Sequence, residues 1–427
     1  MRKLINLLKN TQEVSEYKIT ESKTHSYQLF FVKDKLETNR VSDSILTEVT
    51  VYVDVEGMRG SASFKYSDYM GKKEVKDLIK EAIFNAKLAL NPFYEIPGVQ
   101  SKPKALKSNM KGKDLKEIAE DVAHAVFENK MDDVNYSSAT EIFINKVNKT
   151  IVNSKGLKVS QEKYYGEIEL IPTYDTKDNE VEVYHMIKFS DFDYDGIKNE
   201  VADVLKMAKD RHDAIDLPKN VKNVNIIIDG SECGEVFDYF VEDLNYSCKY
   251  TKSNLFEIGG SVQGEKVRGT KLTLSLVPQF KGCSSSTSFD NDGIVLKDTK
   301  LVDKSVAVSR YGRNQFGYYL GEKEIKGDIP ITKVNPGRVP FASMAKKPYI
   351  RCVRFSSMQL DRASGLVGGE VRLGYYFDGE KEIPVTGFTF TGNMHELKGR
   401  IVLSKETATY SFYHGPKYLL LPKTKII

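Results

Sequence analysis

The chain has 427 residues, which is enough for two or three domains with their own hydrophobic cores. Lys and Arg number 63 and Asp and Glu number 59, so the net charge is only +4 and gives no case for a protein that wraps a polyanion. Hydrophobic residues make up 40% and charged residues 29%, a balance typical of folded globular proteins and not of disordered ones.

Cysteine usage and apolar runs bear on the cellular compartment. The four cysteines, Cys233, Cys248, Cys283 and Cys352, are widely spaced and form no CxxC pair. Such spacing predicts reduced thiols in a reducing compartment. The first residues contain neither the apolar core nor the cleavage site of a signal peptide, and no stretch of about 18 apolar residues occurs in the sequence. We therefore expect a cytoplasmic protein with no membrane contact.

The first half of the sequence predicts alternating helices and strands. Apolar residues recur every three or four positions in the expected helices at 1–10, 73–90, 114–130 and 195–213. Segments rich in Val, Tyr, Phe and Thr predict strands at 27–32, 36–41, 47–55, 61–66, 138–147, 149–152, 157–165, 166–173 and 180–189. Residues 100–114 are basic and polar and predict a solvated connector.

These elements follow a repeated order. Phe64–Asp68 precedes the helix at 73–90, and Lys188–Asp191 precedes the helix at 195–213. Each helix follows a set of strands, and each set follows an earlier helix. We predict two similar modules, about 1–97 and 114–215, in which helices cover one face of an antiparallel sheet. Together they form a predicted N-terminal α+β domain, residues 1–215.

The second half changes character after Asp216–Lys219. An apolar strand is expected at 224–228 and a helix from 231 to about 248. Later strands are expected at 270–277, 300–309, 349–355, 369–377, 383–391, 400–403 and 410–412. A closed or strongly curved structure would hide so many strand edges, so residues 216–427 predict a β-rich, barrel-like domain and an α+β protein overall.

Local motifs for catalysis are weak. His395-Glu396 begins like the HExxH of zinc peptidases, but Gly399 stands where the second histidine belongs. Ser284–Ser288 follows Cys283, yet no nucleophile elbow surrounds it, so a flexible polar loop is expected. No phosphate-binding glycine motif and no module for reading nucleic acid occurs in the sequence.

Four segments of the second half, in this order, resemble the TldD/TldE family, whose members are also called PmbA or "modulator of DNA gyrase" proteins. They are Ser288–Gly293 (SFDNDG), Arg310–Asn314 (RYGRN), Gly369–Tyr376 (GEVRLGYY) and Ile383–Asn393 (IPVTGFTFTGN). The repeated strand and helix order of the first half also suits this family, so the resemblance covers the whole chain.

The resemblance implies where a metal would be held. TldD-type chains carry HExxxH on the helix that opens the C-terminal domain, with a later Cys, and bind a zinc ion that hydrolyses peptides. TldE-type chains lack these ligands and pair with TldD-type chains. Here the motif positions are occupied by Ser231 and Val236, only Glu232 is retained, and residues 410–427 contain no Cys. The resemblance therefore assigns no catalytic, metal or cofactor residue to this chain and places it with the TldE type.

Glu232 also has a structural interpretation. Asp229 followed by Glu232 three residues later resembles a capping box at a helix start. Residues five apart on a helix are about 140° apart, so Ser231 and Val236 would not converge on one ion without distortion. Serine is a poor zinc ligand and valine is none. We expect Val236 to face the core.

The favoured hypothesis is a non-catalytic subunit of a heteromeric zinc peptidase. The expected partners are a TldD-like subunit that supplies the zinc and a peptide substrate, with a homodimer possible and a dimer-forming surface in residues 216–427. Such a chain is inactive by itself. The alternatives are an independent hydrolase with a site around Glu232, Cys233 or Cys283, and a protein that binds nucleic acid or DNA gyrase, for which the charge and motifs give no support.

Overall fold

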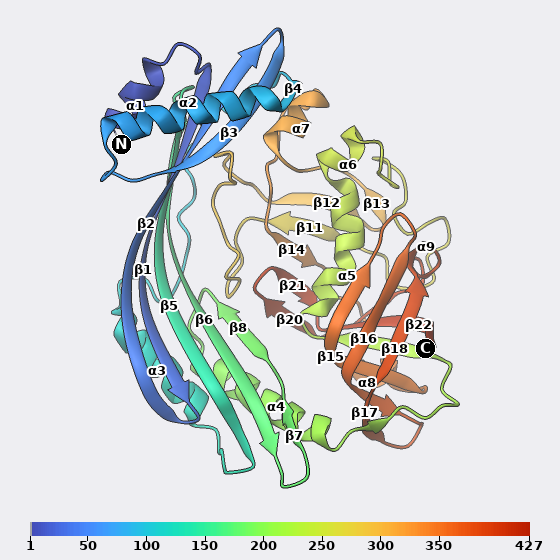
Figure 1. Ribbon diagram of the computed structural model, residues 1–427. Coiled ribbons are helices and arrows are strands. Elements are labelled where there is room, and N and C mark those ends of the chain that lie inside the picture. Colours follow the sequence, from blue (N-terminus) through green and yellow to red (C-terminus); the bar gives the residue numbers. More distant parts are fainter. Residues whose placement is uncertain (1) are drawn as a thin grey trace.

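Residues 2–427 are described by a computed structural model with 21% helix and 43% strand (Figure 1). The N-terminal region contains α1 (Arg2–Lys9), β1 (Glu16–Val32), β2 (Lys35–Val55), β3 (Met58–Tyr66), α2 (Lys72–Leu88), β4 (Leu90–Pro92), α3 (Leu115–Phe127), β5 (Asn135–Asn153), β6 (Lys158–Asp175), β7 (Glu180–Glu182), β8 (His185–Phe189) and α4 (Tyr194–His212). None of the helices within these residues is both long and apolar enough to cross a bilayer.

One large antiparallel sheet forms the N-terminal region. Its strand order is β4-β3-β2-β1-β5-β6-β7, and β8 pairs with β6. The four longest strands, β1, β2, β5 and β6, have 17, 21, 19 and 18 residues. They are longer than the predicted strands because cross-strand pairing continues through polar stretches such as Asn148-Lys149, which pair with both β1 and β6. Figure 1 shows these strands curving around the C-terminal region.

Two helix pairs cover this sheet. The first pair, α1 and α2, packs on β1, β2 and β3 through a core that includes Leu8, Ile19 and Val51. The second pair, α3 and α4, packs on β1, β5 and β6 through a core that includes Val122 and Ile142. Each pair brackets its strands in chain order, as the repeated pattern indicates. The residue limits of the two modules, and of the 1–215 and 216–427 domains, stay predictions.

The C-terminal region is built from many short strands. It contains β9 (Ile215–Asp216), β10 (Asn223–Asp229), α5 (Glu232–Val241), the 3-10 helix η1 (Glu242–Leu244), α6 (Tyr246–Tyr250), β11 (Leu274–Val277), β12 (Thr299–Asp303), β13 (Val306–Ala307), α7 (Asn314–Tyr319), β14 (Ile331–Val334), α8 (Phe341–Met344), β15 (Tyr349–Leu360), β16 (Leu366–Phe377), β17 (Glu382–Thr386), β18 (Phe388–Asn393), α9 (Met394–Leu397), β19 (Val402–Leu403), β20 (Thr407–Tyr410), β21 (Tyr413–Pro416) and β22 (Tyr418–Ile426). The predicted α+β class is confirmed.

A closed barrel organises this region. Five strands follow one another in the order β15-β10-β22-β18-β16, and pairing of β16 with β15 closes the ring. A separate sheet, β13-β12-β11-β14-β21-β20, lies beside it. Helix α5 packs against β10 and β15 of the barrel and against β14 and β21 of this second sheet. One continuous core joins both sheets through α5, and seven of the ten residues of this helix are buried.

The strands predicted at 180–189, 300–309 and 383–391 are each two strands in the structure, and two further predicted elements differ in kind. The helix expected from 231 to 248 ends at Val241, passes through η1 and restarts at Tyr246. Asn245 interrupts it because its backbone is extended and its side-chain oxygen accepts a hydrogen bond from the Ser247 amide at 2.9 Å, as an N-cap does. The strand expected at 410–412 is instead the turn of a hairpin between β20 and β21.

The serine-rich segment at 284–288 also differs from the flexible loop that was expected. The hydroxyls of Ser284 and Ser411 lie 2.7 Å apart, and the Ser288 hydroxyl donates to the Lys104 carbonyl at 2.5 Å. Ser284, Ser286 and Ser288 are all buried. These bonds also anchor the connector at 100–114 to the C-terminal region, so the two polar segments hold each other in place.

Candidate functional site

The start of α5 is the position that the sequence pattern selects. β10 runs through three fully buried isoleucines, Ile226–Ile228, and ends at Asp229. Gly230 then takes a φ of +101°, a backbone conformation that glycine adopts without strain, and turns the chain into α5. A Cβ on Gly230 would lie 3.2 Å from the Glu232 carboxylate, so the turn also leaves room for that side chain.

The three motif positions have different surroundings. The Ser231 hydroxyl donates to Glu232 Oε2 at 3.1 Å. Val236 has no exposed surface and belongs to the core around α5. Ser231 is the N-cap residue, and no side chain caps the helix, so the capping box predicted from Asp229 and Glu232 is wrong. It does not form because Asp229 still lies on β10 and pairs elsewhere.

Asp229 belongs to a charged network on the barrel. Arg351 on β15 donates to Asp229 at 3.0 Å and grips both oxygens of Glu382 on β17 at 3.2 and 3.0 Å. Its guanidinium also lies 4.4 Å from the centre of the Tyr375 ring. Burial raises the pKa of Asp229, and the positive charge of Arg351 acts against this rise. The positive charge of Arg351 therefore balances the negative charge of the mostly buried Asp229 carboxylate.

A second network joins the barrel to the N-terminal region. Arg354 Nη2 on β15 lies 3.0 Å from His185 Nδ1 on β8, and His185 Nε2 lies 2.8 Å from Glu200 Oε1 on α4. A guanidinium can only donate, so His185 Nδ1 accepts and its Nε2–H donates to Glu200. Burial lowers the pKa of Arg354, while the charges of Glu232 and Glu200 act to raise it. The Nε of Arg354 has no hydrogen-bond partner within residues 2–427.

These two networks meet around Tyr410 of β20. Burial, followed by the charges of Asp229, Cys233, Glu200 and Glu232, raises the pKa of the Tyr410 hydroxyl. The cluster of Asp229, Glu232, Arg354, Glu200 and Tyr410 therefore shares one electrostatic environment between α5, β15 and α4.

The residues at this cluster do not suit a zinc ion. Structural and catalytic zinc sites need three or four converging His, Cys or carboxylate ligands. No group of three or more such side chains converges anywhere within residues 2–427. At the motif itself, the Ser231 hydroxyl is engaged with Glu232 and the Val236 side chain is apolar and enclosed. We therefore derive no zinc-dependent step for this chain.

The thiols considered for an independent hydrolase are enclosed. Cys233 lies beside the Ile228 carbonyl, with its Sγ at 3.2 Å, and burial strongly raises the pKa of its thiol. Cys283 has its Sγ 3.1 Å from the Tyr410 carbonyl, and burial raises the pKa of its thiol to about 12. A nucleophilic cysteine needs the thiolate form and access to solvent, and these two residues have neither.

The sequence pattern found Glu232 but not the residues around it. Arg351, Arg354, His185 and Glu200 come from three elements, and Arg354 is 169 residues away from His185. No motif joins them in the sequence. The available signal that charged partners lie nearby is the pair of arginines that flank Cys352-Val353 in the buried first half of β15.

With this geometry described, comparisons with known proteins identify the class. Residues 221–426 match the family model described as "PmbA/TldA metallopeptidase C-terminal domain". The fold of the whole chain is also that of solved members: the chain is a member of the PmbA/TldD/TldE family. A search of curated protein sequences gives no match.

Three solved structures resemble the chain over its full length. TldE from Thermococcus kodakarensis superimposes with a TM-score of 0.79 at 13% identity, covering 100% of this chain and 99% of that one. A putative modulator of DNA gyrase from Bacteroides thetaiotaomicron gives 0.77 at 15%, covering 100% and 97%. A second putative modulator of DNA gyrase, from Thermotoga maritima, gives 0.74 at 14%, covering 100% and 99%. At these identities the likeness establishes the fold.

Proposed function

We propose that this chain is a TldE-like, non-catalytic subunit of a heteromeric zinc peptidase that degrades or processes peptides. A TldD-like partner supplies the zinc and the hydrolytic step. The observation that carries the proposal is Val236, which stands at the second histidine position of HExxxH and is fully enclosed in the core. Because valine has no atom that can bind a metal and this side chain is enclosed, Val236 cannot act as a metal ligand.

The environment of Glu232 supports the same proposal. In a zinc peptidase the glutamate after the first histidine acts as a general base on a metal-bound water. Here the Glu232 carboxylate accepts a hydrogen bond from Ser231 and lies in the field of Arg354. In this proposal Glu232 has a structural role at the start of α5 and takes no part in proton transfer.

The expected assembly is a pair of chains in the cytoplasm. Each chain contributes half of the enclosing shell and part of the peptide-binding surface. An obligate interface commonly buries about 2,000 Å² or more, so the pair is expected to be stable at micromolar concentration.

The test is co-expression with a TldD-like chain from the same genome, followed by size exclusion, metal analysis and a peptide-degradation assay. We expect co-elution, about one zinc per pair, well under one zinc in this chain alone, and activity only in the pair. Replacing the glutamate of the partner's HExxxH by Gln should abolish activity, whereas Glu232→Gln in this chain should change it less than about twofold. Failure to co-elute, or zinc-dependent cleavage by this chain alone, would overturn the proposal.

A further inference from the structure

The outer half of β2 is an open sheet edge. β3 pairs with β2 only between Thr47 and Val55, whereas β1 pairs with it from Lys35 to Tyr52. Residues 35–46 therefore have a strand on one side and none on the other within residues 2–427. An open edge presents a row of unpaired backbone N–H and C=O groups, which is a template for another strand.

The backbone groups that face this edge can be identified. The Ser15 amide, just before β1, donates to the Tyr52 carbonyl at 3.0 Å, so Tyr52 directs its backbone groups toward β1. Backbone direction alternates along a strand, and the only register shift between the two strands lies beyond Thr38, at the Phe30/Phe31 bulge of β1. The residues that direct their N–H and C=O groups outward are therefore Asn39, Val41, Asp43 and Ile45.

Four of the twelve side chains in residues 35–46 are apolar and exposed. Leu36, Val41, Ile45 and Leu46 are 51%, 59%, 66% and 51% exposed. Natural sheets block their edges with proline, lysine, bulges or a covering helix. Residues 35–46 contain no proline, and their one lysine, Lys35, stands at the hairpin end. The edge is thus long and free of proline, with Arg40 and Asp43 as the charged residues of its middle.

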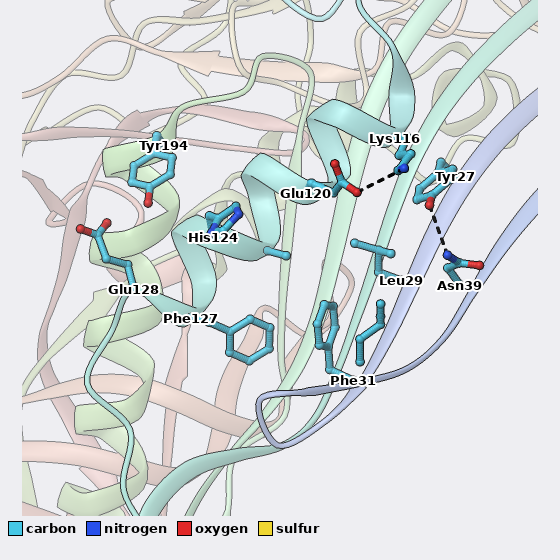
Figure 2. Close-up of a pocket in the computed structure, with 12 residues that line it drawn as sticks. Tyr27, Leu29, Phe31, Asn39, Lys116, Glu120, His124, Phe127, Glu128 and Tyr194 are labelled. Atoms are coloured by element: carbon cyan, nitrogen blue, oxygen red, sulfur yellow. Dashed lines mark hydrogen bonds and ion pairs between the residues drawn. The ribbon is translucent and has the colours of Figure 1, made fainter.

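An apolar groove adjoins the edge on the face that carries α3. It has a volume of about 650 Å³ and is lined by Leu29 and Phe31 of β1 and by Ala123 and Phe127 of α3. Leu36 of β2 borders it on the edge side. Figure 2 shows Leu29, Phe31 and Phe127 directed into this space between the strands and the helix. A strand added to β2 would project alternate side chains toward this side of the sheet.

Charge decides between two occupants of the edge. Arg40 and Asp43 are three residues apart in an extended strand, so they point to opposite faces. When two copies of the chain pair as antiparallel strands about a two-fold axis, each residue lies opposite a residue of the same face. Arg40 of one copy therefore cannot lie opposite Asp43 of the other. Asp43 uses one oxygen for His25, at 2.8 Å, and its second oxygen is free to receive a cation from a different chain.

We propose that residues 35–46 of β2 bind an extended peptide segment of another protein as an added antiparallel strand. The segment carries apolar side chains opposite Val41 and Ile45, a basic one opposite Asp43 and an acidic one opposite Arg40. Backbone hydrogen bonds give the affinity and the side chains give the preference, as in other cases of strand addition. The proposal deepens the proposed function, on which it rests for its biological role, because it names a surface that holds peptides.

The test uses the full chain alone, so that its result does not depend on a TldD-like partner. The probe is the fluorescein-labelled peptide Thr-Val-Thr-Lys-Thr-Val-Glu-Thr, with a scrambled peptide as control, followed by fluorescence anisotropy. Val41→Pro removes an outward amide without removing a bond to β1, and it should weaken binding at least tenfold. The matched variant Val41→Ala keeps the amide and should weaken binding less than about threefold.

Charge and exchange measurements complete the test. Replacing Lys by Glu in the probe should weaken binding about tenfold, and Asp43→Lys should restore it. Saturating probe should slow amide hydrogen exchange in residues 35–46 of the unmodified chain, a result that needs no variant to fold. Unchanged exchange under saturation would overturn the proposal. Protection of this segment that grows with protein concentration, without probe, would also overturn it and assign the edge to a second copy of the chain.

Discussion

The start of α5 and the outer half of β2 satisfy their polar groups in opposite ways. At α5, the Asp229 carboxylate pairs with Arg351 of another strand, and the Glu232 carboxylate accepts a hydrogen bond from Ser231. Along residues 35–46 of β2, every second residue directs an N–H and a C=O to an edge without a strand. In the first region the two carboxylates have partners within the chain, whereas in the second region backbone N–H and C=O groups remain open to a further strand.

The two regions show that a position singled out by a sequence motif need not be the position that can bind a ligand. In the function we propose, α5 stands where TldD-type chains carry their metal ligands, whereas in this chain Val236 packs in the core and Ser231 donates to Glu232. The β2 edge carries no motif at all, yet it offers backbone groups and exposed apolar side chains. We therefore expect this chain to bind peptides at open surfaces such as the β2 edge. We expect α5 to contribute mainly to the stability of the C-terminal region.

The largest effect is expected from Arg351→Met, which tests whether α5 depends on its ion pairs. The substitution leaves the Asp229 carboxylate buried without its cation, and the loss of one partner of a buried pair costs about 3 kcal/mol or more. The free energy of unfolding, measured with urea, should fall by that amount. The double variant Arg351→Met with Asp229→Asn removes the unpaired charge and should recover part of the loss. Equal stability of all three proteins would break the comparison.

Restoring the motif histidines should cost slightly less. Val236→His places a polar ring in a fully enclosed apolar site and should lower the free energy of unfolding by about 2 to 3 kcal/mol. Ser231→His, at a partly exposed position, should change it by less than about 1 kcal/mol. The double variant should show no peptidase activity, because two histidines fall short of three ligands. Zinc-dependent cleavage by it, lost on adding Glu232→Gln, would mean that a catalytic pocket survives at α5.

A smaller, pH-dependent effect is expected at Asp238 on α5. Burial, with the charges of Glu242 and Glu235, raises the pKa of Asp238 to about 7. Between its unfolded pKa of about 4 and this value, the folded state binds the extra proton, so its contribution to stability falls as the pH rises. Asp238→Asn should therefore stabilise the protein by about 1 to 2 kcal/mol at pH 8 and by much less at pH 4.

Asp290 provides the contrast for that measurement. Burial also raises the pKa of Asp290 to about 7, but its carboxylate accepts hydrogen bonds from the amides of Asp292, Ile294 and Asp328. Asparagine offers only one acceptor oxygen, so Asp290→Asn should destabilise the protein at pH 8. If both substitutions shift stability in the same direction, the burial of Asp238 does not control the pH dependence.

The smallest effect is expected from alkylation. All four cysteines are free and buried, and burial raises the pKa of Cys233, Cys283 and Cys352. Iodoacetamide at pH 8 should label none of them in the folded protein within an hour and all of them in 6 M guanidinium, as read by intact mass. Rapid labelling of Cys233 or Cys283 in the folded state would instead support an independent hydrolase with a reactive thiol near α5.

The sequence by itself determined the helices of the N-terminal region, the β-rich character of the C-terminal region and the family. These features depend on local periodicity and on the order of short segments, which are properties of neighbouring residues. The burial of Val236 could also be predicted, because valine next to Phe237 and near Phe240 on a helix favours the core. The interpretation of Asp229 as a helix cap was wrong because its partner, Arg351, lies 122 residues away.

Tertiary structure alone decided which polar groups are satisfied. The network of Arg354, His185 and Glu200 exists because β15, β8 and α4 meet across the two regions, and pairing of distant elements leaves no trace in local sequence patterns. The open edge of β2 has the same cause. Its sequence mixes polar, charged and apolar residues without strict alternation, and only the end of β3's pairing at Thr47 leaves residues 35–46 without a second neighbouring strand within residues 2–427.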